Sequence, residues 1–135
     1  MPSVVFHLED PHRCGITISM LDPWRILWKA AGIEEFDLID MTTDGYFGGM
    51  GDAAVTRHRS LDAFEPEYPV VLMETGSAVL LCDFRHPQEC HYVFGPSMGL
   101  SGHEDWLRVS IPMVGLEARD AGAIVAGHRV MQQWQ

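Results

Sequence analysis

The stretch that decides the fold is Tyr92-Val93-Phe94-Gly95-Pro96-Ser97-Met98-Gly99-Leu100-Ser101, followed by Ile111-Pro112-Met113-Val114. In each stretch an apolar strand runs into a tight turn that contains glycine or proline. Glycine has no side chain, so such a turn lets the backbone come close to a ligand. We therefore expect a pocket that holds its ligand with backbone amides and carbonyls.

Length and composition predict one globular domain over residues 1–135, because 47% of the residues are hydrophobic. No apolar run approaches the roughly 20 residues of a membrane span. The opening Met1-Pro2-Ser3-Val4-Val5-Phe6 lacks the basic region of a signal peptide. The odd set of Cys14, Cys82 and Cys90 fits reduced thiols, so we expect a cytoplasmic protein without a membrane partner.

The charge balance argues against general binding of nucleic acids. The formal net charge is −10, and contacts to phosphate dominate the affinity of proteins for RNA and DNA. A local basic patch is still compatible with this charge. Arg57-His58-Arg59 is the densest candidate, and Arg13 and Arg25 could join it in space. Scattered, solvated arginines are the alternative interpretation.

The first third of the chain has the pattern of a βαβ unit. Ser3–Leu8 is rich in valine and phenylalanine and predicts a strand. A helix is predicted over Leu21–Gly32, with Asp22 as its N-cap, Pro23 at its first position and Gly32 at its end. Its buried stripe is expected to be Trp24, Leu27, Trp28 and Ala31. A second strand at Phe36–Asp40 then implies parallel pairing.

The rest of the chain continues the alternation of strands and helices. Further strands are predicted at Ala53–Thr56, Pro69–Thr75, His91–Phe94 and Leu107–Ile111, and helices at Ser60–Glu65 and Glu117–Trp134. Met41–Gly51 reads as a loop, and it contains neither glycine pattern of the phosphate-binding loops. The fold class that follows is α/β, with a parallel sheet flanked by helices.

Several motifs resemble one family. Phe94-Gly95-Pro96 with Gly99-Leu100, then Ile111-Pro112-Met113 and an alanine-rich last helix, resemble the SpoU branch of the SPOUT methyltransferases. Within it the chain looks most like the small bacterial enzymes that methylate the ribose 2′-hydroxyl of the tRNA wobble nucleotide. Val55–His58, and Val71–Thr75 before Gly76, are also similar to that subgroup.

The resemblance implies a C-terminal deep trefoil knot that binds S-adenosylmethionine, and a homodimer packed through the first and last helices. The implied cofactor-binding residues follow three strands: Met73, Glu74, Thr75 and Gly76; Phe94, Gly95, Pro96, Gly99 and Leu100; Ile111, Pro112, Met113 and Leu116. Apart from the resemblance, the charge of Arg57 and the imidazole of His58 make these two residues candidates for contact with tRNA phosphate.

Two of the family's motifs are degenerate. The first is Asn-x-Gly followed by arginine. Either Arg13-Cys14-Gly15 fills it, which puts Ser19 in the arginine's place, or Arg25 stands there in the first turn of the predicted helix. We prefer Arg25 as the catalytic residue, because the capped helix fixes its position. The Ser-x-Asn of the third motif is replaced by Gly115–Asp120, where Arg119 or Asp120 could supply a polar group.

The family's helix between the second and third strands also looks absent, since the loop Thr42–Gly51 stands in its place and shortens the domain. The predicted function is an S-adenosylmethionine-dependent methyltransferase for the ribose 2′-hydroxyl of RNA, with tRNA as the substrate. Two alternatives remain. One is a knotted S-adenosylmethionine-binding protein that has lost methyl transfer and acts as a binding or regulatory module. The other is an enzyme that uses the same pocket for another reaction.

A metal site is a further alternative. Cys82, His86, Cys90 and His91 lie close together in the sequence, but they lack the paired spacing of zinc ligands. We expect a turn at Pro87 and a buried cysteine before a strand, and no metal.

Overall fold

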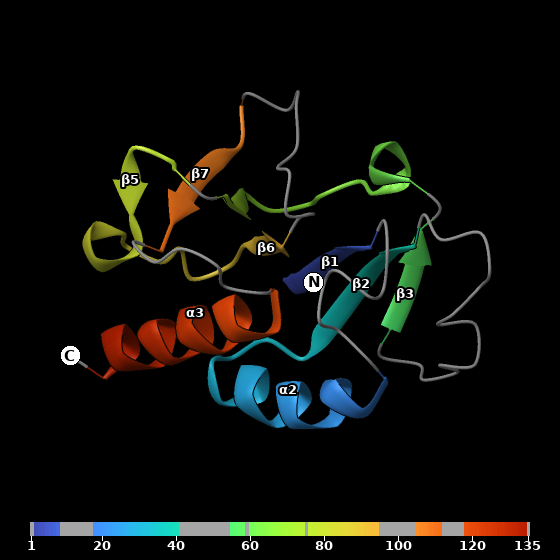
Figure 1. Cartoon of the computed structure of the whole chain (residues 1–135), viewed down its shortest axis with the longest axis horizontal. Helices are drawn as coiled ribbons and strands as arrows, with labels where there is room; N and C mark the ends of the chain where they lie inside the picture. Colours follow the sequence, from blue (N-terminus) through green and yellow to red (C-terminus); the bar gives the residue numbers. More distant parts are fainter. Residues whose placement is uncertain are drawn as a thin grey trace.

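The computed structural model describes residues 2–8, 18–40, 55–58, 60–74, 76–94, 105–111 and 118–134. These residues form a seven-stranded sheet in the order β3-β2-β1-β6-β4-β7-β5, and every pairing is parallel (Figure 1). The strands are β1 (Ser3–Leu8), β2 (Glu35–Asp40), β3 (Val55–His58), β4 (Val70–Met73), β5 (Val79–Leu80), β6 (His91–Phe94) and β7 (Leu107–Ser110). The predicted α/β fold with a parallel sheet is confirmed.

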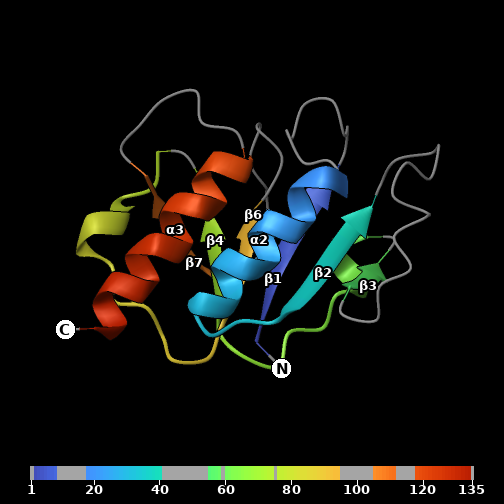
Figure 2. The same cartoon turned by 90° about the horizontal axis from the view of Figure 1, so that it is seen from below.

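The two described α-helices, α2 (Ile18–Ala30) and α3 (Ala118–Gln133), lie side by side on the same face of the sheet (Figures 1 and 2). Two short 3-10 turns, η1 (Leu61–Ala63) and η2 (Leu81–Asp83), complete the described elements. Neither described α-helix has the length and the apolar character that a membrane crossing needs. The predicted knot depends on segments that include residues 95–104 and 112–117, which lie outside the described residues.

The predicted βαβ unit is also confirmed. β1 pairs with β2 in parallel from Ser3 opposite Glu35 to Leu8 opposite Asp40, and α2 connects the two strands. β1 is an interior strand, because β6 pairs with its other edge. Val4 and Val5 point to opposite faces of the sheet and are both fully buried. An apolar run without alternation is what a strand covered on both faces requires.

The helix α2 begins earlier than the sequence predicted. It starts at Ile18, so Pro23 lies inside it, and the predictions of Asp22 as N-cap and Pro23 as first residue are wrong. Proline lacks an N–H and therefore costs this helix its bond to the carbonyl of residue 19. Residues 18–22, which precede Pro23, are nevertheless helical and form one helix with the buried stripe. Trp24, Trp28 and Ala31 are buried and Leu27 packs against them, as predicted.

The end of α2 is the predicted glycine stop. Gly32 has a φ of +88° and donates its N–H to the carbonyl of Lys29 at 3.0 Å. Ile33 donates its N–H to the carbonyl of Trp28 at 2.9 Å. These two bonds form a Schellman motif, which needs a residue with positive φ and therefore favours glycine.

The hydrophobic core lies on both faces of the sheet. On the helix face, Trp24 and Trp28 of α2 surround Phe94 of β6, with ring centroids 5.9 and 6.1 Å from it. The opposite face carries a smaller cluster made of Val5, Ile39, Phe64, Val70, Leu72 and Val93. The strands that carry the predicted turns are thus fixed by packing on both sides.

Other boundaries differ by small amounts. β3 spans Val55–His58 and so continues two residues past the predicted end at Thr56, while Ala53 and Ala54 lie outside the described residues. The predicted helix Ser60–Glu65 is the single turn η1. β4 is shorter than Pro69–Thr75, whereas β6 and α3 match their predictions within one residue. The sequence did not predict β5 or η2. The predicted loop Met41–Gly51 lies outside the described residues.

Candidate functional site

The predicted cofactor turns follow three strands that are neighbours in the sheet. The order β6-β4-β7 places β4 in the middle, and Met73 of β4 stands opposite Phe94 of β6 and Val109 of β7. All three strands run in the same direction, so their carboxyl ends meet at one edge of the sheet. Ligands of open parallel sheets bind outside this edge. The topology thus brings together chain segments that are far apart in sequence.

The described apolar residues at this edge belong to the core. Phe94 is buried between the two tryptophans of α2. Met73 and Ile111 are partly buried and pack against the same cluster. These side chains make the sheet apolar beneath this edge. The Phe94 ring is packed against Trp24 and Trp28 in the core.

The turn after β4 is held by polar contacts to β7. Glu74 donates its backbone N–H to the carbonyl of Val109 at 3.0 Å, and Ser77 donates its hydroxyl to the carbonyl of Glu74 at 2.9 Å. Ser110 donates its hydroxyl to the carbonyl of Ser77 at 3.0 Å. Gly76 has a φ of +82°, a conformation that side chains disfavour. This turn is therefore well defined by its neighbours.

An ion pair adds to these contacts. Arg108 of β7 donates its Nε–H to the Glu74 carboxylate at 2.9 Å. The sequence prediction included Glu74 and Gly76 but missed Arg108, Ser77 and Ser110. Their positions in the sequence could have identified them. All three residues flank the predicted turns and carry polar side chains next to apolar strands.

The remaining predicted cofactor residues, Thr75, Gly95, Pro96, Gly99, Leu100, Pro112, Met113 and Leu116, lie outside the described residues. The same holds for the alternative Arg13-Cys14-Gly15 and for the side chain of Arg119.

Arg25 does not stand in the first turn of its helix, contrary to the prediction. It is the eighth residue of α2, which begins at Ile18, and its side chain is partly buried. It follows Trp24, whose ring packs on Phe94 at the end of β6. The earlier start of α2 therefore places Arg25 about two turns into the helix.

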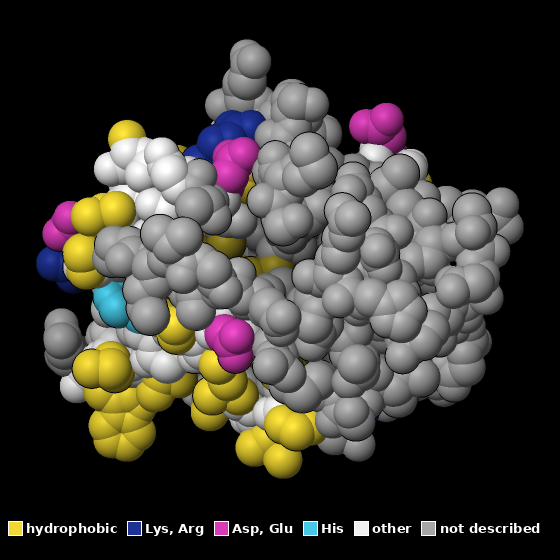
Figure 3. All heavy atoms as spheres, in the orientation of Figure 1, with side chains coloured by type: hydrophobic (Ala, Val, Ile, Leu, Met, Phe, Trp, Pro, Cys, Tyr) yellow, Lys and Arg dark blue, Asp and Glu magenta, His cyan; other side chains and the backbone are white. Residues whose placement is uncertain are grey.

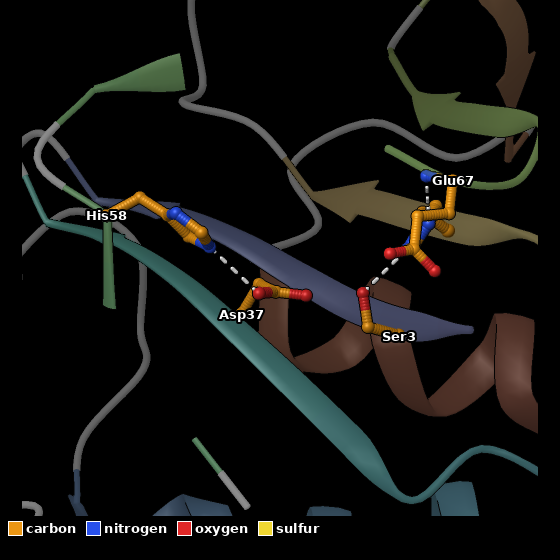
Figure 4. Close-up of polar contacts among 5 residues, drawn as sticks. Ser3, Asp37, His58 and Glu67 are labelled. Carbon is orange, nitrogen blue, oxygen red and sulfur yellow. Dashed lines mark hydrogen bonds and ion pairs between the residues drawn. The ribbon is translucent and has the colours of Figure 1, made fainter. Parts of the chain in front are cut away.

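The predicted RNA contacts lie on β3, away from the cofactor turns. Three strands, β2, β1 and β6, separate β3 from β4. The His58 imidazole Nε2 bonds the Asp37 carboxylate of β2 at 2.8 Å (Figure 4). The His58 ring also packs edge-on against Phe64. Arg57 is part of β3, and its side chain is outside the described set. The structure thus separates the predicted RNA contacts from the predicted cofactor residues.

A buried histidine, His91, lies at the start of β6 on the face of the sheet opposite the helices, where its ring also packs against Phe64. His91 accepts the backbone N–H of Glu67 at Nε2, at 3.3 Å, so its Nδ1 carries the proton and donates to the Ser3 hydroxyl at 2.7 Å (Figure 4). Burial lowers the pKa of His91. The neutral imidazole joins β1, β6 and the segment before β4. This is a structural role.

The other face carries a buried arginine near the end of α3. Arg129 donates to the carbonyls of Ala31, Pro87 and Gln88 at 2.6–2.7 Å and to the Tyr92 hydroxyl at 2.9 Å. Its guanidinium therefore ties α3 to the end of α2 and to the loop before β6. Burial raises the pKa of Tyr92 and of the Cys90 thiol.

Two histidines extend this network. His86 Nδ1 lies 2.7 Å from the Tyr92 hydroxyl, and His86 Nε2 lies 2.7 Å from His128 Nδ1. Burial, with His128 and Arg129 nearby, lowers the pKa of His86 to about 4. His86 and His91 thus belong to separate networks. Cys90 is buried before β6, as predicted, and Cys82 is exposed. Among the described residues no three His, Cys, Asp or Glu side chains form a group that could hold a metal ion.

No protein-family model and no curated protein sequence matches the chain. Solved structures do. The SpoU methyltransferase AviRb from Streptomyces viridochromogenes, in complex with the cofactor AdoMet, matches with a TM-score of 0.66 at 21% identity, over 98% of this chain and 58% of that one. An AdoMet-bound rRNA methyltransferase from Sinorhizobium meliloti matches with a TM-score of 0.64 at 18% identity, over 96% of this chain and 55% of that one.

A third structure concerns the 2-OH methylation of C/U34 on tRNA. It matches with a TM-score of 0.60 at 18% identity, and the match covers 98% of this chain and 94% of that chain. This chain therefore spans somewhat more than half of AviRb and nearly all of the third structure. At these identities the likeness concerns the fold, and the chain has the fold of the SpoU methyltransferases.

Proposed function

We propose that this protein binds S-adenosylmethionine at the carboxyl ends of β6, β4 and β7 and methylates the ribose 2′-hydroxyl of RNA. The observation that carries the proposal is the adjacency of these three strands, which brings their turns to one edge of the sheet. The complex of AviRb with AdoMet, which has the same fold, supports the choice of cofactor. An apolar floor with backbone donors and acceptors suits an adenine ring.

We assign the cofactor to the three predicted turns. The residues that would hold it are Met73, Glu74, Thr75 and Gly76, then Phe94, Gly95, Pro96, Gly99 and Leu100, then Ile111, Pro112, Met113 and Leu116. Since Phe94 is buried between tryptophans, its contribution would come from its backbone. Glycines and prolines in these turns would keep the backbone close to the ligand.

The bound cofactor would supply an electrophilic methyl group. The protein must then place the ribose oxygen in line with it and help the hydroxyl proton to leave. Arg25 is the proposed catalytic residue, because a guanidinium is always charged and stabilises negative charge on oxygen. Arg25 follows Trp24 in α2, and the Trp24 ring packs on Phe94 at the end of β6. This sequence neighbour is the observation that links Arg25 to the proposed cofactor edge.

We assign tRNA as the substrate, with the wobble nucleotide as target. The structure that concerns C/U34 of tRNA is matched over 94% of its length, so the two chains are of similar size. Arg57 and His58 of β3 are the proposed RNA contacts, and they would reach a part of the tRNA remote from the methylated ribose. The proposal includes the trefoil knot and a cytoplasmic location.

The proposal also includes a homodimer through α2 and α3. Four large apolar side chains of this region are exposed to solvent: Ile26 at 76%, Ile124 at 36%, Met131 at 67% and Trp134 at 87%. Figure 3 shows hydrophobic side chains exposed on the side of the molecule where α2 and α3 lie. Exposed apolar patches of this kind commonly mark an interface.

The motif changes favour a second candidate, a protein that binds S-adenosylmethionine without transferring its methyl group. The sequence lacks the asparagines of the first and third motifs, and Arg25 lies deeper in its helix than the family pattern implies. A third candidate is an enzyme that uses the same pocket for another reaction.

Calorimetry with S-adenosylmethionine and S-adenosylhomocysteine tests what the three candidates share. We expect binding, and its absence at millimolar ligand would contradict all of them. Methyl transfer to unmodified total tRNA then separates the first candidate from the others. Arg25→Ala should abolish transfer, whereas Arg85→Ala, which removes an exposed arginine from a loop, should not. Binding without transfer in the wild type would favour the second or third candidate.

A further inference from the structure

The turn Glu74–Ser77, after β4, is tied to β7 by its side chains as well as by its backbone. The Glu74 amide bonds the Val109 carbonyl, and the Ser110 hydroxyl bonds the Ser77 carbonyl. Arg108 bonds the Glu74 carboxylate at 2.9 Å. Each of these three contacts joins the exit of one strand to the exit of its neighbour. The residues after β4 and the end of β7 therefore form one unit.

Arg108 has a central place in this unit. Its Nε–H reaches Glu74, and its Nη1 lies 3.5 Å from the carbonyl of Trp106. Trp106 in turn packs against the core cluster on the face opposite the helices. The planar guanidinium can bridge two acceptors in this way, whereas the single ammonium of lysine cannot reproduce the geometry.

The ion pair between Glu74 and Arg108 is partly shielded from water, so it can contribute to the order of the turn. The side chains of Glu74 and Arg108 are 24% and 26% exposed. The surface pair Lys29–Glu34 offers a contrast, since it is 3.8 Å long with side chains 74% and 63% exposed. Ion pairs of the exposed kind contribute little, while a short charged hydrogen bond that is partly shielded from water is stronger.

We infer that Arg108 is a positioning residue for the cofactor. By holding the Glu74 carboxylate it keeps the end of β4 and the residues that follow it coupled to the end of β7. This inference rests on the proposed function, and it adds a residue that is not among the proposed cofactor contacts. A turn that is ordered before binding loses less conformational entropy when the ligand arrives.

The first test needs no ligand. Amide hydrogen exchange in Arg108→Gln should be about 10-fold faster at Glu74, because that N–H bonds Val109 within the unit. The amide of Ile33, which bonds Trp28 at the far end of α2, should exchange as in the wild type. Unchanged exchange at Glu74 would overturn the inference.

The second test measures the affinity for S-adenosylhomocysteine by calorimetry. Arg108→Gln should weaken binding roughly 10-fold and Arg108→Lys by less, at a temperature where urea unfolding shows every variant to be folded. Lys29→Gln, which breaks the exposed pair, should bind like the wild type. Wild-type affinity in Arg108→Gln would overturn the inference.

A double-mutant cycle separates positioning from direct contact. If Arg108 acts through Glu74, then Glu74→Gln should weaken binding less in Arg108→Gln than in the wild type, because the coupled part of the loss has already occurred. Fully additive losses would contradict the coupling. If the wild type does not bind S-adenosylhomocysteine, the proposed function fails, and the exchange experiment alone decides whether Arg108 orders the turn.

Discussion

Gly122 of α3 lies against the indole ring of Trp24 in α2, so close that a β-carbon at this position would overlap the ring. The missing side chain of Gly122 therefore lets α3 pack directly against the indole ring of α2. Trp24 cannot move away easily, since it also packs on Phe94 at the end of β6. The packing of the helix pair and the position of the proposed cofactor edge are thus linked through one aromatic ring.

Gly122→Ala should lower the free energy of unfolding by about 1–3 kcal/mol, because overpacking of a rigid contact forces side chains or backbone to shift. The matched control is Gly127→Ala in the same helix, where a β-carbon would meet nothing within 4 Å. That variant should be roughly 0.5–1 kcal/mol more stable, since alanine suits a helix better than glycine. Urea unfolding measures both, and equal effects of the two changes would contradict the close approach.

Arg129→Met should destabilise the fold by about 3 kcal/mol, because three backbone carbonyls lose at once the donor that a buried guanidinium supplies. The affected acceptors belong to Ala31, Pro87 and Gln88. Arg85→Met removes an exposed arginine from the same loop region and should change stability little. A small effect at Arg129, measured by urea unfolding, would show that the network is not needed.

Acid should destabilise the protein through His86. Its pKa is lowered from 6.5 to about 4 in the folded protein, so the unfolded chain takes up the proton first. The stabilisation by neutral His86 is complete above pH 6.5 and is lost as the pH falls through about 4. Protonation would place a positive charge on a part-buried ring that also feels the charges of His128 and the Arg129 guanidinium.

Unfolding by urea at a series of pH values measures this effect. His86→Gln should flatten the decline between pH 6.5 and 4, the two pKa values that bound it. Part of the decline should persist, because burial lowers the pKa of His91 in the same direction. An NMR titration of the His86 imidazole that gives an ordinary pKa would contradict the prediction.

The proposed homodimer predicts that Trp134→Ser combined with Ile26→Glu yields monomers. Both changes replace exposed apolar side chains of α2 or of the residue just after α3 with polar ones. Val79→Ser is the control, since Val79 is 45% exposed but lies on β5 at the far edge of the sheet. Sedimentation equilibrium distinguishes the mass of the monomer from that of the dimer. A wild-type protein that is already monomeric would refute the dimer.

The elements that the sequence predicted best are those with one strong local pattern. The stripe from Trp24 to Ala31 and the stop at Gly32 located α2, although the start was placed one turn late. The error arose because Asp22 and Pro23 are typical of a helix start, while the chain before them also continues the helix. β5 could not be predicted, because its two residues are defined by pairing with β7 residues 30 positions later in the chain.

The candidate site was predictable in part for a similar reason. The three turns carry glycine and proline patterns that are visible in the sequence. Their adjacency depends on strand order, which follows from the family resemblance and not from the residues alone. The partners of the buried Arg129 are backbone carbonyls, which every residue possesses, so no pattern of side chains could identify them.

The pairing of β1 with β6 has a consequence for synthesis of the chain. Ser3 and His91 are 88 positions apart, yet they are opposite each other in the middle of the sheet. A nascent chain that has not yet released β6 from the ribosome leaves one edge of β1 without its partner. Exposed strand edges promote aggregation, and contacts so distant in sequence form slowly. The exposed edge of β1 is therefore covered only after the last third of the chain has been synthesised. Truncation before His91 should yield insoluble protein.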